Sequence, residues 1–366
     1  MEVKIMNILQ LSKHMNDSGV NSHVIELSKQ LRKLDHKIIV ASSGGPHVEK
    51  LTDNDITHLN IDFISKNPIT QIKNIHKLIK VIEENNIEII HSHWRKTSII
   101  AQLIKMFTGV NFVWTNHLNN IPSGLIHRLL TFYGKKAITV SSDMVPFLTS
   151  NLGISKNDIE VVYNAVDESA YNLLDIKEKN IIRSNFEIET TDIVVTLLGR
   201  LAPVKGHLFL IEAMRDIASK HPKLNFKLFF TGDGPDDYKN EIEQLAKLYK
   251  MDNQIIYTGY TDPVKILSVS DLMVLPSENE GFGIVCIEAF AMRVPVIRTN
   301  TGGYSDMKNY CIGIEYGNVE GLSQAIEDVI SNEGLKTNMI NTAYSFFNEQ
   351  LTSDKMAKKI LKIYGE

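Results

Sequence analysis

Two carboxylates in the second half of the chain, Glu280 and Glu288, flank a glycine-containing run that suits ligand binding. The run Glu280-Gly281-Phe282-Gly283-Ile284 follows an apolar segment typical of a buried strand and leads into one typical of a helix. At such a junction, free backbone N–H groups and the helix dipole bind anions such as phosphate. The carboxylates repel phosphate and suit hydroxyl groups instead. The segment therefore predicts a pocket for a ligand that carries both kinds of group.

A second loop brings positive charge to the same edge of the predicted sheet. The segment from Gly199 to Gly206, with Arg200 and Lys205 inside it, follows the predicted strand Ile193–Leu198. A guanidinium is a planar fork and an ammonium a point charge, so the two can hold a diphosphate and stabilise it as a leaving group. The alternative is an exposed loop with ordinary surface cations. Because the acidic loop follows a neighbouring strand, we favour a diphosphate clamp, and both loops together predict a nucleotide-sugar site.

Glu288 lies on a segment whose other residues are nearly all apolar. A buried carboxylate without partners is costly, and a ribose diol would supply two partners. The alternative is a partner inside the fold, such as an arginine or a backbone group. Two further glycine loops, Gly232-Asp233-Gly234-Pro235 and Thr301-Gly302-Gly303, follow strands of the same predicted sheet. Turn chemistry alone explains the first, so we place it in the wall of the site.

In the first half of the chain, histidines stand where predicted strands end. His91 and His93 close one strand, and His117 follows the next. His117 could hydrogen-bond a sugar hydroxyl or orient an acceptor, although a histidine at a strand end often only satisfies backbone groups. No HxxxH or CxxC spacing supports a zinc site, so we predict no metal.

Gly19 ends the loop after the first strand and could let the backbone approach a phosphate. The loop lacks the GxGxxG dinucleotide fingerprint, which occurs nowhere in the chain, and the GxxxxGK(S/T) signature is absent too. These absences weaken a nicotinamide or P-loop interpretation.

Length and composition set the frame for these sites. The chain has 366 residues, of which 43% are hydrophobic and 22% charged, as expected for two globular domains. Two cysteines, Cys286 and Cys311, are too few for a disulfide framework and indicate a reducing compartment. No apolar run approaches the roughly 18 residues of a membrane span, and the N-terminus does not have the pattern of a signal peptide. We therefore expect a cytoplasmic protein.

Charge is unevenly distributed along the chain. Residues 1–165 hold 18 Lys and Arg against 14 Asp and Glu, a net +4, whereas the remainder holds 21 against 29, a net −8. No acidic residue occurs from Ile89 to Ser142, a stretch with two apolar-rich segments, Ser98–Phe107 and Leu125–Tyr133. Ordinary packing helices with surface cations are one interpretation. The other is a peripheral contact with an anionic membrane surface at the inner face of the membrane. We expect no nucleic-acid partner.

Short β-branched runs alternate with helical patterns throughout, as in parallel-sheet α/β proteins. The predicted strands are Ile5–Leu11, Lys37–Ala41, Ile56–Ile61, Glu88–His91, Asn111–Thr115, Ala137–Val140, Glu160–Tyr163, Ile193–Leu198, Lys227–Thr231, Gln254–Thr258, Leu272–Leu275 and Pro295–Arg298. The predicted helices include Asn21–Leu34, Ile69–Asn85, Ser98–Phe107, Leu208–Ser219, Tyr238–Leu248, Pro263–Val269, Ile284–Met292, Ser323–Ile330 and Thr352–Tyr364. The polar stretch Glu168 to Asn180 is interpreted as an interdomain linker.

With these residues in view, the chain resembles family 4 of the retaining glycosyltransferases, of the bacterial surface-polysaccharide type. The matching features are Gly199-Arg200 with Lys205-Gly206, Gly232-Asp233-Gly234-Pro235, Glu280-Gly281-Phe282-Gly283 with Glu288, Gly302-Gly303, the hinge-like Asn164-Ala165-Val166-Asp167, and Ser18-Gly19 with His23. The resemblance implies the GT-B fold, an α/β architecture of two facing, doubly wound Rossmann-like domains with a cleft between them. It makes residues 1–167, with a C-terminal crossover helix at about 350–366, the acceptor-binding domain, and residues 168–349 the donor-binding domain.

The resemblance also implies roles for individual residues. Arg200 and Lys205 would hold the diphosphate, Glu288 the ribose and Glu280 the hydroxyls of the donor sugar. With His117 near the transferred sugar, the predicted catalytic residues are His117, Arg200, Lys205 and Glu280. The predicted donor-binding residues are Gly19, Gly199, Arg200, Lys205, Gly234, Glu280, Gly281, Phe282, Gly283, Ile284 and Glu288, and the predicted acceptor-binding residues are Asn16, His93 and His117. No cofactor or metal is expected.

The predicted activity is that of a retaining, metal-independent glycosyltransferase (hexosyltransferase) in cell-surface polysaccharide biosynthesis. The expected donor is a nucleotide-sugar, UDP-linked, and the expected acceptor is a glycan or an undecaprenyl-diphosphate-linked glycan. A nucleotide-sugar epimerase or phosphorylase on a similar scaffold is one alternative, and a catalytically silent nucleotide-sugar binding subunit is another. The chain departs from the family pattern at Ser18-Gly19, where two glycines are usual, and at Asp306, where glutamate is common.

Overall fold

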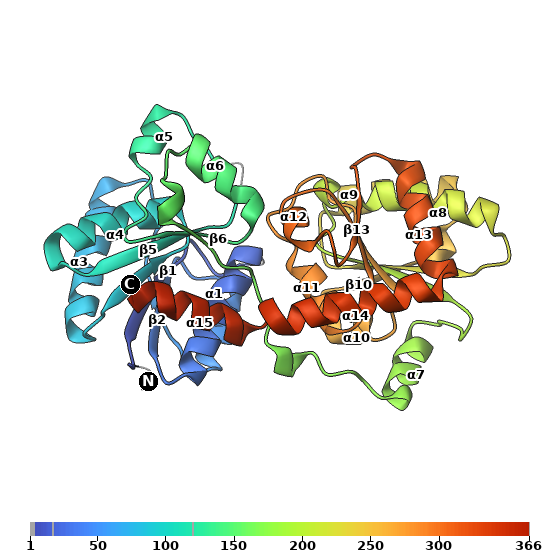
Figure 1. Cartoon of the computed structure of the whole chain (residues 1–366), viewed down its shortest axis with the longest axis horizontal. Coiled ribbons are helices and arrows are strands. Elements are labelled where there is room, and N and C mark those ends of the chain that lie inside the picture. Colours follow the sequence, from blue (N-terminus) through green and yellow to red (C-terminus); the bar gives the residue numbers. More distant parts are fainter. Residues whose placement is uncertain (1–3, 17, 119–120, 366) are drawn as a thin grey trace. The chain divides into compact units, whose positions relative to one another are not determined.

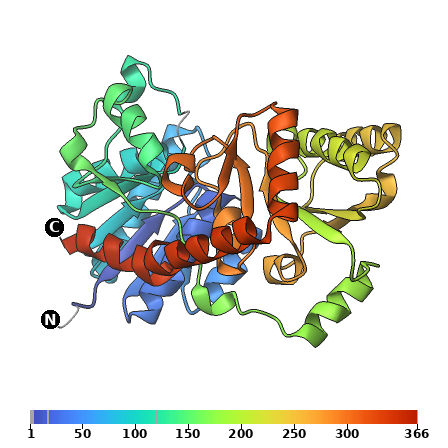
Figure 2. The ribbon, with the colours of Figure 1, turned by 45° about the vertical axis from the view of Figure 1, so that its right-hand side comes forward.

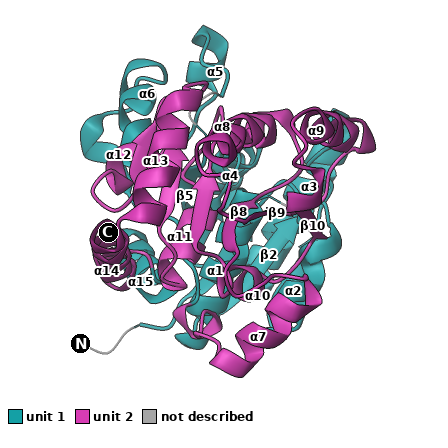
Figure 3. Cartoon of the chain, turned by 90° about the vertical axis from the view of Figure 1, so that its right-hand side faces the viewer, with its two compact units in different colours: residues 1–167, 352–366 teal, residues 168–351 magenta. Residues whose placement is uncertain are grey.

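A computed structural model describes residues 4–16, 18–118 and 121–365, which form two compact units (Figure 3). Unit 1 takes the chain up to Asp167 together with the segment that starts at Thr352, and unit 2 takes Glu168–Leu351. Each unit contains one parallel sheet covered by helices. The predicted fold class, two Rossmann-like α/β domains, is confirmed.

The described part of unit 1 contains a seven-stranded sheet in the order β3-β2-β1-β4-β5-β6-β7, with parallel pairing throughout (Figure 1). Its strands are β1 (Asn7–Leu11), β2 (Lys37–Ser42), β3 (Thr57–Asn60), β4 (Ile89–Ser92), β5 (Asn111–Asn116), β6 (Ala137–Thr139) and β7 (Ile159–Val161). The strand order reverses between β1 and β4, because the chain first winds toward β3 and then toward β7. Loops after β1 and β4 therefore meet at a topological switch point.

Helices cover both faces of this sheet. They are α1 (Gly19–Lys33), α2 (Glu49–Thr52), α3 (Pro68–Glu84), α4 (Arg95–Thr108), α5 (Leu125–Leu129), α6 (Val145–Ser150) and α15 (Ser353–Gly365). Alternate residues of β1 point to opposite faces: Ile8 packs with residues of α1 and α15, whereas Leu9 and Leu11 pack with residues of α3 and α4. The pleat of one central strand thus supplies two apolar cores.

Local sequence signals explain where two of these helices begin and end. The hydroxyl of Ser18 accepts a hydrogen bond from the backbone N–H of Asn21 and caps α1, whose last turn carries Arg32 and Lys33. Gly109, with φ = +75°, ends α4 in a left-handed conformation that favours glycine. These ends set the length of the two helices that flank the switch point.

Unit 2 contains a six-stranded parallel sheet in its described residues, in the order β10-β9-β8-β11-β12-β13. Its strands are β8 (Ile193–Leu198), β9 (Phe226–Thr231), β10 (Ile255–Gly259), β11 (Leu272–Leu275), β12 (Val296–Thr299) and β13 (Ile312–Ile314). Its helices are α7 (Ile176–Asn185), α8 (His207–Lys220), α9 (Asp236–Leu248), α10 (Pro263–Leu267), α11 (Ile284–Ala291), α12 (Tyr304–Met307), α13 (Val319–Ser331) and α14 (Glu333–Gln350). The main core lies between the strands and α8, α9 and α13, and α8 packs against α13 (Figure 2).

The predicted strands and helices are confirmed to within a few residues, but β13, α14 and the short helices α6 and α12 were not among them, and the linker was interpreted differently. The strand β13 was missed because it has only three residues and a central Gly313. The helix α14 was missed because its apolar residues follow no clear helical period. The predicted linker is partly wrong, since α7 starts inside it. Asp175 and Glu178 form a capping box there, and each side chain accepts a hydrogen bond from the other's backbone N–H.

Candidate active site

In unit 2, the loops after β8 and β11 meet at the switch point of the sheet. These two strands are paired neighbours, and the strand order reverses between them. In open α/β sheets, ligands bind outside the carboxyl ends of strands at this position. The cationic segment Gly199 to Gly206 follows β8, and the acidic segment Glu280 to Ile284 follows β11. The topology therefore brings both predicted segments to one place.

Close backbone contacts hold these loops together, and glycine makes them possible. Gly206 has φ = +76°, and a Cβ atom there would lie 2.1 Å from the backbone oxygen of Pro276. A Cβ atom on Gly302, in the loop after β12, would lie 2.3 Å from the backbone oxygen of Glu280. Both distances are far below van der Waals contact, so a larger residue would separate the loops. The backbone N–H of Glu278 donates a hydrogen bond of 2.9 Å to the backbone oxygen of Val204, which joins the loop after β11 to the loop after β8.

At this junction, Nζ of Lys205 forms an ion pair with Oε1 of Glu280. The hydroxyl of Ser277 donates a hydrogen bond of 3.0 Å to the same oxygen. The Lys205 and Glu280 side chains are only 21% and 12% exposed, so solvent screens their attraction less than on an open surface. The predicted clamp lysine and the predicted sugar-binding carboxylate are thus direct partners, and Ser277 is a member of this group that the sequence did not reveal.

The other predicted donor-binding residues of unit 2 lie in the loops after β8, β9 and β11 and on α11. Arg200 is exposed in the loop after β8, one residue beyond Gly199, and Gly234 is exposed in the loop after β9. Gly281 is partly buried, Phe282 is buried, Gly283 is the left-handed N-cap of α11, and Ile284 is its first helical residue. A strand, a glycine loop and a helix therefore follow one another as the sequence predicted.

Glu288 projects from α11 and has a partner inside the fold. Its Oε1 accepts a hydrogen bond of 3.0 Å from the hydroxyl of Tyr171. Tyr171 belongs to the polar segment before α7, where nothing in the sequence suggested a site residue. A partner inside the fold was one of the two alternatives that the sequence left open, and Tyr171 is such a partner.

Arg298 is a buried residue that the sequence placed in a strand without assigning it a role. It is 1% exposed, and its guanidinium donates hydrogen bonds to the backbone oxygens of Phe282, at 2.8 Å, and Gly302, at 2.7 Å. It thereby ties the loop after β11 to the loop after β12. A charged residue at the end of an apolar strand was the available signal. The nearby thiols are buried, and burial raises the pKa of Cys286 to about 11 and that of Cys311 to about 12, which disfavours their thiolate forms.

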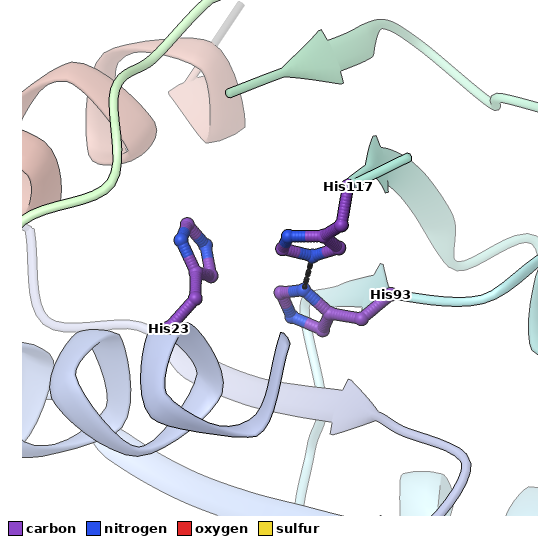
Figure 4. Close-up of side chains that lie close together, drawn as sticks. All are labelled: His23, His93 and His117. Atoms are coloured by element: carbon purple, nitrogen blue, oxygen red, sulfur yellow. Dashed lines mark hydrogen bonds between the residues drawn. The ribbon is translucent and has the colours of Figure 1, made fainter. Parts of the chain in front are cut away.

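In unit 1, a cluster of histidines lies at the switch point between β1 and β4. His23 comes from α1, His93 follows β4, and His117 follows β5 (Figure 4). Nδ1 of His93 lies 3.2 Å from Nε2 of His117, and Nε2 of His93 lies 2.9 Å from Oε1 of Gln10. Nδ1 of His23 lies 2.9 Å from Oδ1 of Asn164. The two amide oxygens fix the orientation of two imidazole rings, and the predicted residues His93 and His117 are in contact.

His91 extends this cluster toward the C-terminal helix. Its Nδ1 lies 2.7 Å from the hydroxyl of Tyr364 on α15, and its Nε2 lies 2.6 Å from the hydroxyl of Thr115 on β5. Its ring lies 4.1 Å from that of His93, measured between centroids. The last helix of the chain therefore supports the strand ends that carry the histidines, a connection that sequence spacing could not reveal.

Burial keeps these imidazoles uncharged at neutral pH. Desolvation lowers the pKa of His23 to about 4, and it lowers the pKa values of His91, His93 and His117 well below the ordinary value. Repulsion between neighbouring rings adds to the effect for His91, His93 and His117. His117 can therefore donate or accept a hydrogen bond as a neutral group but does not supply a positive charge.

Three of these histidines could hold a metal ion. Ligand nitrogens of His23, His93 and His117 all lie within 4.8 Å of one another, and Nε2 of His23 is buried with no hydrogen-bond partner in the described part of the chain. The sequence did not predict this group, because its residues come from a helix and from two separate strand ends. No spacing of His or Cys residues within one helix or strand predicts this arrangement.

A cavity of about 480 Å³ opens beside the histidines, within unit 1. His93 and His117 line it, together with Ser12, Lys13 and His14 after β1. The remaining lining is mostly apolar or cationic: Ser18, Val20, Asn21, Trp94, Arg95, Lys96, Ile99, Trp114, Thr115, Asn116, Leu118, Ile121, Pro122, His127 and Leu130. No Asp or Glu of the described chain is part of this lining. The cavity therefore suits a ligand with apolar and anionic parts.

Two predicted residues of the first loop lie outside this lining. Asn16 is exposed, and its backbone oxygen accepts a hydrogen bond of 2.6 Å from the side chain of Asn21. Gly19 is the exposed first residue of α1. The structure thus places His93 and His117 in the lining of the cavity, whereas Asn16 and Gly19 lie outside this lining.

Two family models match the chain, one over each unit. Residues 18–170 match "Glycosyltransferase Family 4", and residues 178–346 match "Glycosyl transferases group 1". The chain is a glycosyltransferase, with a match to a family 4 model in unit 1 and to a group 1 model in unit 2. Its two-unit architecture is that of the GT-B glycosyltransferases, whose solved structures it resembles over nearly their whole length.

Relatives of this glycosyltransferase include a glucosaminyl malate synthase and a capsular polysaccharide enzyme. It is 28% identical to the N-acetyl-alpha-D-glucosaminyl L-malate synthase of Bacillus anthracis, over 93% of this chain and 91% of the relative. It is 24% identical to the capsular polysaccharide biosynthesis glycosyltransferase CapM of Staphylococcus aureus, over 92% and 91%. Among solved structures, a glycosyltransferase from Rickettsia africae has a TM-score of 0.88 at 27% identity, with 98% of each chain covered.

A more distant structure, Anabaena Alr3699/HepE in complex with UDP and glucose, has a TM-score of 0.86 at 18% identity and covers 99% of this glycosyltransferase and 100% of that chain. This likeness concerns the fold. Within residues 4–16, 18–118 and 121–365, this glycosyltransferase has no helix with the length and hydropathy needed to cross a membrane.

Proposed function

We propose that this glycosyltransferase moves a sugar from a UDP-linked donor to a hydroxyl of a glycan or an undecaprenyl-diphosphate-linked glycan, with retention of anomeric configuration. The observation that carries the proposal is the pairing of Lys205 with Glu280 at the switch point of unit 2. One loop there supplies a cation for a diphosphate, and the other supplies a carboxylate for sugar hydroxyls. UDP and UDP-glucose complexes of Anabaena Alr3699/HepE support the choice of nucleotide.

In the proposed reaction, unit 2 holds the donor. Arg200 and Lys205 neutralise the diphosphate as it leaves, since negative charge builds on it when the bond to the anomeric carbon breaks. Glu288 takes the ribose diol, and Glu280 takes hydroxyls of the sugar. When a diphosphate draws Lys205 away, the hydroxyl of Ser277 still holds Glu280 in place. The ion pair of the ligand-free protein therefore keeps both groups positioned for the donor.

Retention without a protein nucleophile fits the residues of unit 1. A double displacement needs a carboxylate beside the anomeric carbon; the described lining of the unit 1 cavity contains none, and in this scheme Glu280 binds the sugar hydroxyls instead. We therefore favour attack from the face that the diphosphate leaves, with the departing phosphate accepting the proton. His117 contributes a neutral hydrogen bond to the sugar, because burial lowers its pKa well below the ordinary range. No step in this scheme requires a metal.

We further propose that the enzyme works in the cytoplasm at the inner face of the membrane, on a surface-polysaccharide intermediate. Leu125, Ile126 and Leu129 of α5 are 74%, 70% and 68% exposed, and α5 belongs to the stretch that lacks acidic residues. Exposed aliphatic side chains next to cations suit an anionic lipid surface. The relationship to a capsular polysaccharide enzyme is in keeping with this role.

The proposal is tested first by donor binding and then by product analysis. Thermal shift with UDP, GDP, ADP and their glucose conjugates should select the uridine compounds. Incubation with UDP-sugars and acceptors should release UDP only when an acceptor is present, and NMR should show the donor's anomeric configuration in the product. An isomerised donor without transfer would indicate an epimerase, release by inorganic phosphate a phosphorylase, and binding without turnover a silent subunit. Each of these outcomes would refute the proposal.

A further inference from the structure

A chain of hydrogen bonds in unit 1 ends at His117, in the lining of the cavity. We infer that Nδ1 of His117 accepts a hydrogen bond from a hydroxyl of the donor sugar, and that Gln10 is the positioning residue that fixes this direction. The inference rests on the proposed function, which places the transferred sugar beside His117. It goes further by stating which partner donates and which side chains decide this.

The chain begins at a serine whose hydroxyl can donate in only one direction. Oγ of Ser28 lies 2.7 Å from the backbone oxygen of Val24, one turn earlier in α1. Two oxygens at that distance repel unless a proton lies between them, so the hydroxyl donates to the carbonyl. The hydroxyl therefore accepts in its other contact, the hydrogen bond of 2.8 Å from Nε2 of Gln10. The amide nitrogen of Gln10 is thus held on the side of Ser28.

Gln10 determines the tautomer of His93. Its Oε1 lies 2.9 Å from Nε2 of His93, and an amide oxygen only accepts hydrogen bonds. Nε2 of His93 must therefore carry the proton. Burial lowers the pKa of His93 well below its ordinary value and keeps the ring neutral, so Nδ1 of the same ring has a lone pair.

His93 in turn determines the tautomer of His117. Nδ1 of His93 lies 3.2 Å from Nε2 of His117 (Figure 4). Because the first nitrogen has the lone pair, the proton between the two rings belongs to Nε2 of His117. Burial keeps this ring neutral as well, since it lowers the pKa of His117 well below the ordinary value. Nδ1 of His117 is therefore a hydrogen-bond acceptor.

Nδ1 of His117 is also the end of the chain that a ligand can reach. Among the described residues, this nitrogen takes part in no hydrogen bond, and it is not one of the fully buried atoms that lack a partner. His117 lines the cavity next to His93. A lone pair that is open to a cavity is satisfied by a donor, and a sugar hydroxyl is such a donor.

The direction of this hydrogen bond affects the reaction as well as binding. When the bond to the anomeric carbon breaks, positive charge builds on the sugar. The lone pair is the negative end of the imidazole dipole, so it stabilises that charge, whereas an N–H group in its place would oppose it. Gln10 lies outside the lining of the cavity and acts on the rate only through His93 and His117.

NMR of the ligand-free, full-length protein with labelled histidine nitrogens tests the tautomers without a substrate. In wild type we expect the proton on Nε2 in both His93 and His117. Gln10→Met should shift His117 toward the tautomer with the proton on Nδ1, because a buried N–H of His93 without an acceptor costs more than a buried lone pair. Ser28→Ala frees the amide of Gln10 to turn and should give a mixture. Ser22→Ala, at an exposed position of α1, is the matched control and should keep the wild-type tautomers.

Kinetics with UDP-glucose tests the effect on the reaction. Gln10→Met should lower kcat about tenfold with little change in KM, and Ser28→Ala should lower it by less, since the acceptor at His117 acts mainly on the charged transition state. Ser22→Ala should keep the wild-type rate. Circular dichroism establishes that each variant is folded.

Analogues of UDP-glucose, with single hydroxyls replaced by hydrogen or by fluorine, test the direction at the sugar. Fluorine cannot donate a hydrogen bond. The hydroxyl that His117 holds is the one whose replacement affects wild type but not His117→Ala. At that position, fluorine and hydrogen should both lower kcat/KM about tenfold. Activity that fluorine restores and hydrogen does not would show that His117 donates, and would overturn the inference.

The tautomers give the other decisive outcomes. A proton on Nδ1 of His117 in wild type would overturn the inference outright. Unchanged tautomers in Gln10→Met would remove Gln10 from its positioning role, and a lower rate in that variant would then be a structural effect. Failure of wild type to turn over UDP-glucose would count against the proposed function, whereas the NMR measurement would still decide the direction of the chain.

Discussion

The two units share a doubly wound sheet topology, but the charged side chains at their switch points are paired differently. In unit 2, Lys205 is paired with Glu280, and the buried Arg298 donates hydrogen bonds to backbone oxygens. In unit 1, Nε and Nη2 of Arg95 have no hydrogen-bond partner among the described residues, and the buried histidines that line the same cavity are neutral. A site with both signs of charge suits a ligand with phosphates and hydroxyls. A site with cations alone suits an anion.

The largest expected effect comes from removing the cation of unit 2. Lys205→Ala should lower kcat about 100- to 1,000-fold, since the leaving diphosphate loses a charge partner that acts mainly in the transition state. Steady-state kinetics with a UDP-sugar checks this, and Lys223→Ala, at an exposed lysine of the same unit, should keep normal rates. Turnover within twofold of wild type in Lys205→Ala would exclude the clamp.

The second effect concerns the buried arginine that ties two loops. Arg298→Met should lower the free energy of unfolding by about 2–3 kcal/mol, because the backbone oxygens of Phe282 and Gly302 lose their donors. Chemical denaturation measures the change, with Arg215→Met, at an exposed position of α8, as the control. An unchanged midpoint in Arg298→Met would show that water or other donors replace the guanidinium at no cost.

Acid should destabilise unit 1 more than unit 2. The pKa values of His23, His91, His93 and His117 are lowered by burial, so the unfolded chain binds protons below about pH 6.5 that the folded chain does not. Stability is therefore unaffected above that pH and falls as the pH drops below it, by up to about 1.4 kcal/mol per pH unit for each histidine. The loss levels off below the folded pKa, about 4 for His23.

Hydrogen exchange at pH 7 and pH 5 resolves this difference between the units. Unit 2 has one strongly shifted histidine in the described chain, His207, whose pKa burial lowers to about 4. Amides of β4 and β5 should lose more protection than those of β8 and β9. Equal losses in both sheets would show that the histidine cluster is not the source of acid sensitivity.

A smaller effect is expected at the hydroxyl that holds Glu288. Tyr171→Phe should raise the KM for the nucleotide-sugar about five- to tenfold with little change in kcat, since it removes one hydrogen bond of 3.0 Å to a carboxylate. Kinetics with donor varied at fixed acceptor checks this. Tyr260→Phe, at an exposed tyrosine of unit 2, should behave as wild type. A reduced kcat with unchanged KM would place Tyr171 in the chemical step instead.

Removal of metal should have the smallest effect of all. In the proposed mechanism Arg200 and Lys205 balance the charge of the leaving diphosphate, so dialysis against EDTA should leave turnover unchanged. Activity that disappears with EDTA and returns with a divalent cation would contradict this. Parallel measurements on His93→Ala would then establish whether the histidine cluster holds the ion.

Much of the fold was predictable because its signals are local. Strand Ile193–Leu198 is a continuous apolar run, and its observed bounds agree with the prediction. The glycine loops and the order strand, loop, helix around Glu280 were equally evident. The helix α7 was missed because its residues are polar and bury nothing, although its capping box was visible in the sequence.

The site was only partly predictable because its contacts join distant segments. Lys205 and Glu280 were each recognised, but not as partners separated by 75 positions. Tyr171 is 117 positions from Glu288, and no periodicity or motif relates them. The sequence showed a stretch without acidic residues, but nothing in it singled out Arg95.

The sequence by itself determined the parallel α/β class, the positions of the glycine loops and the residue types available for a diphosphate and for hydroxyls. These features follow from hydrophobic period and turn chemistry, which act over a few residues. Tertiary structure alone decided which charges are paired and which are left without a counter-ion. Such pairing depends on burial and on strand order, because parallel strands join residues far apart in the chain at one edge of a sheet.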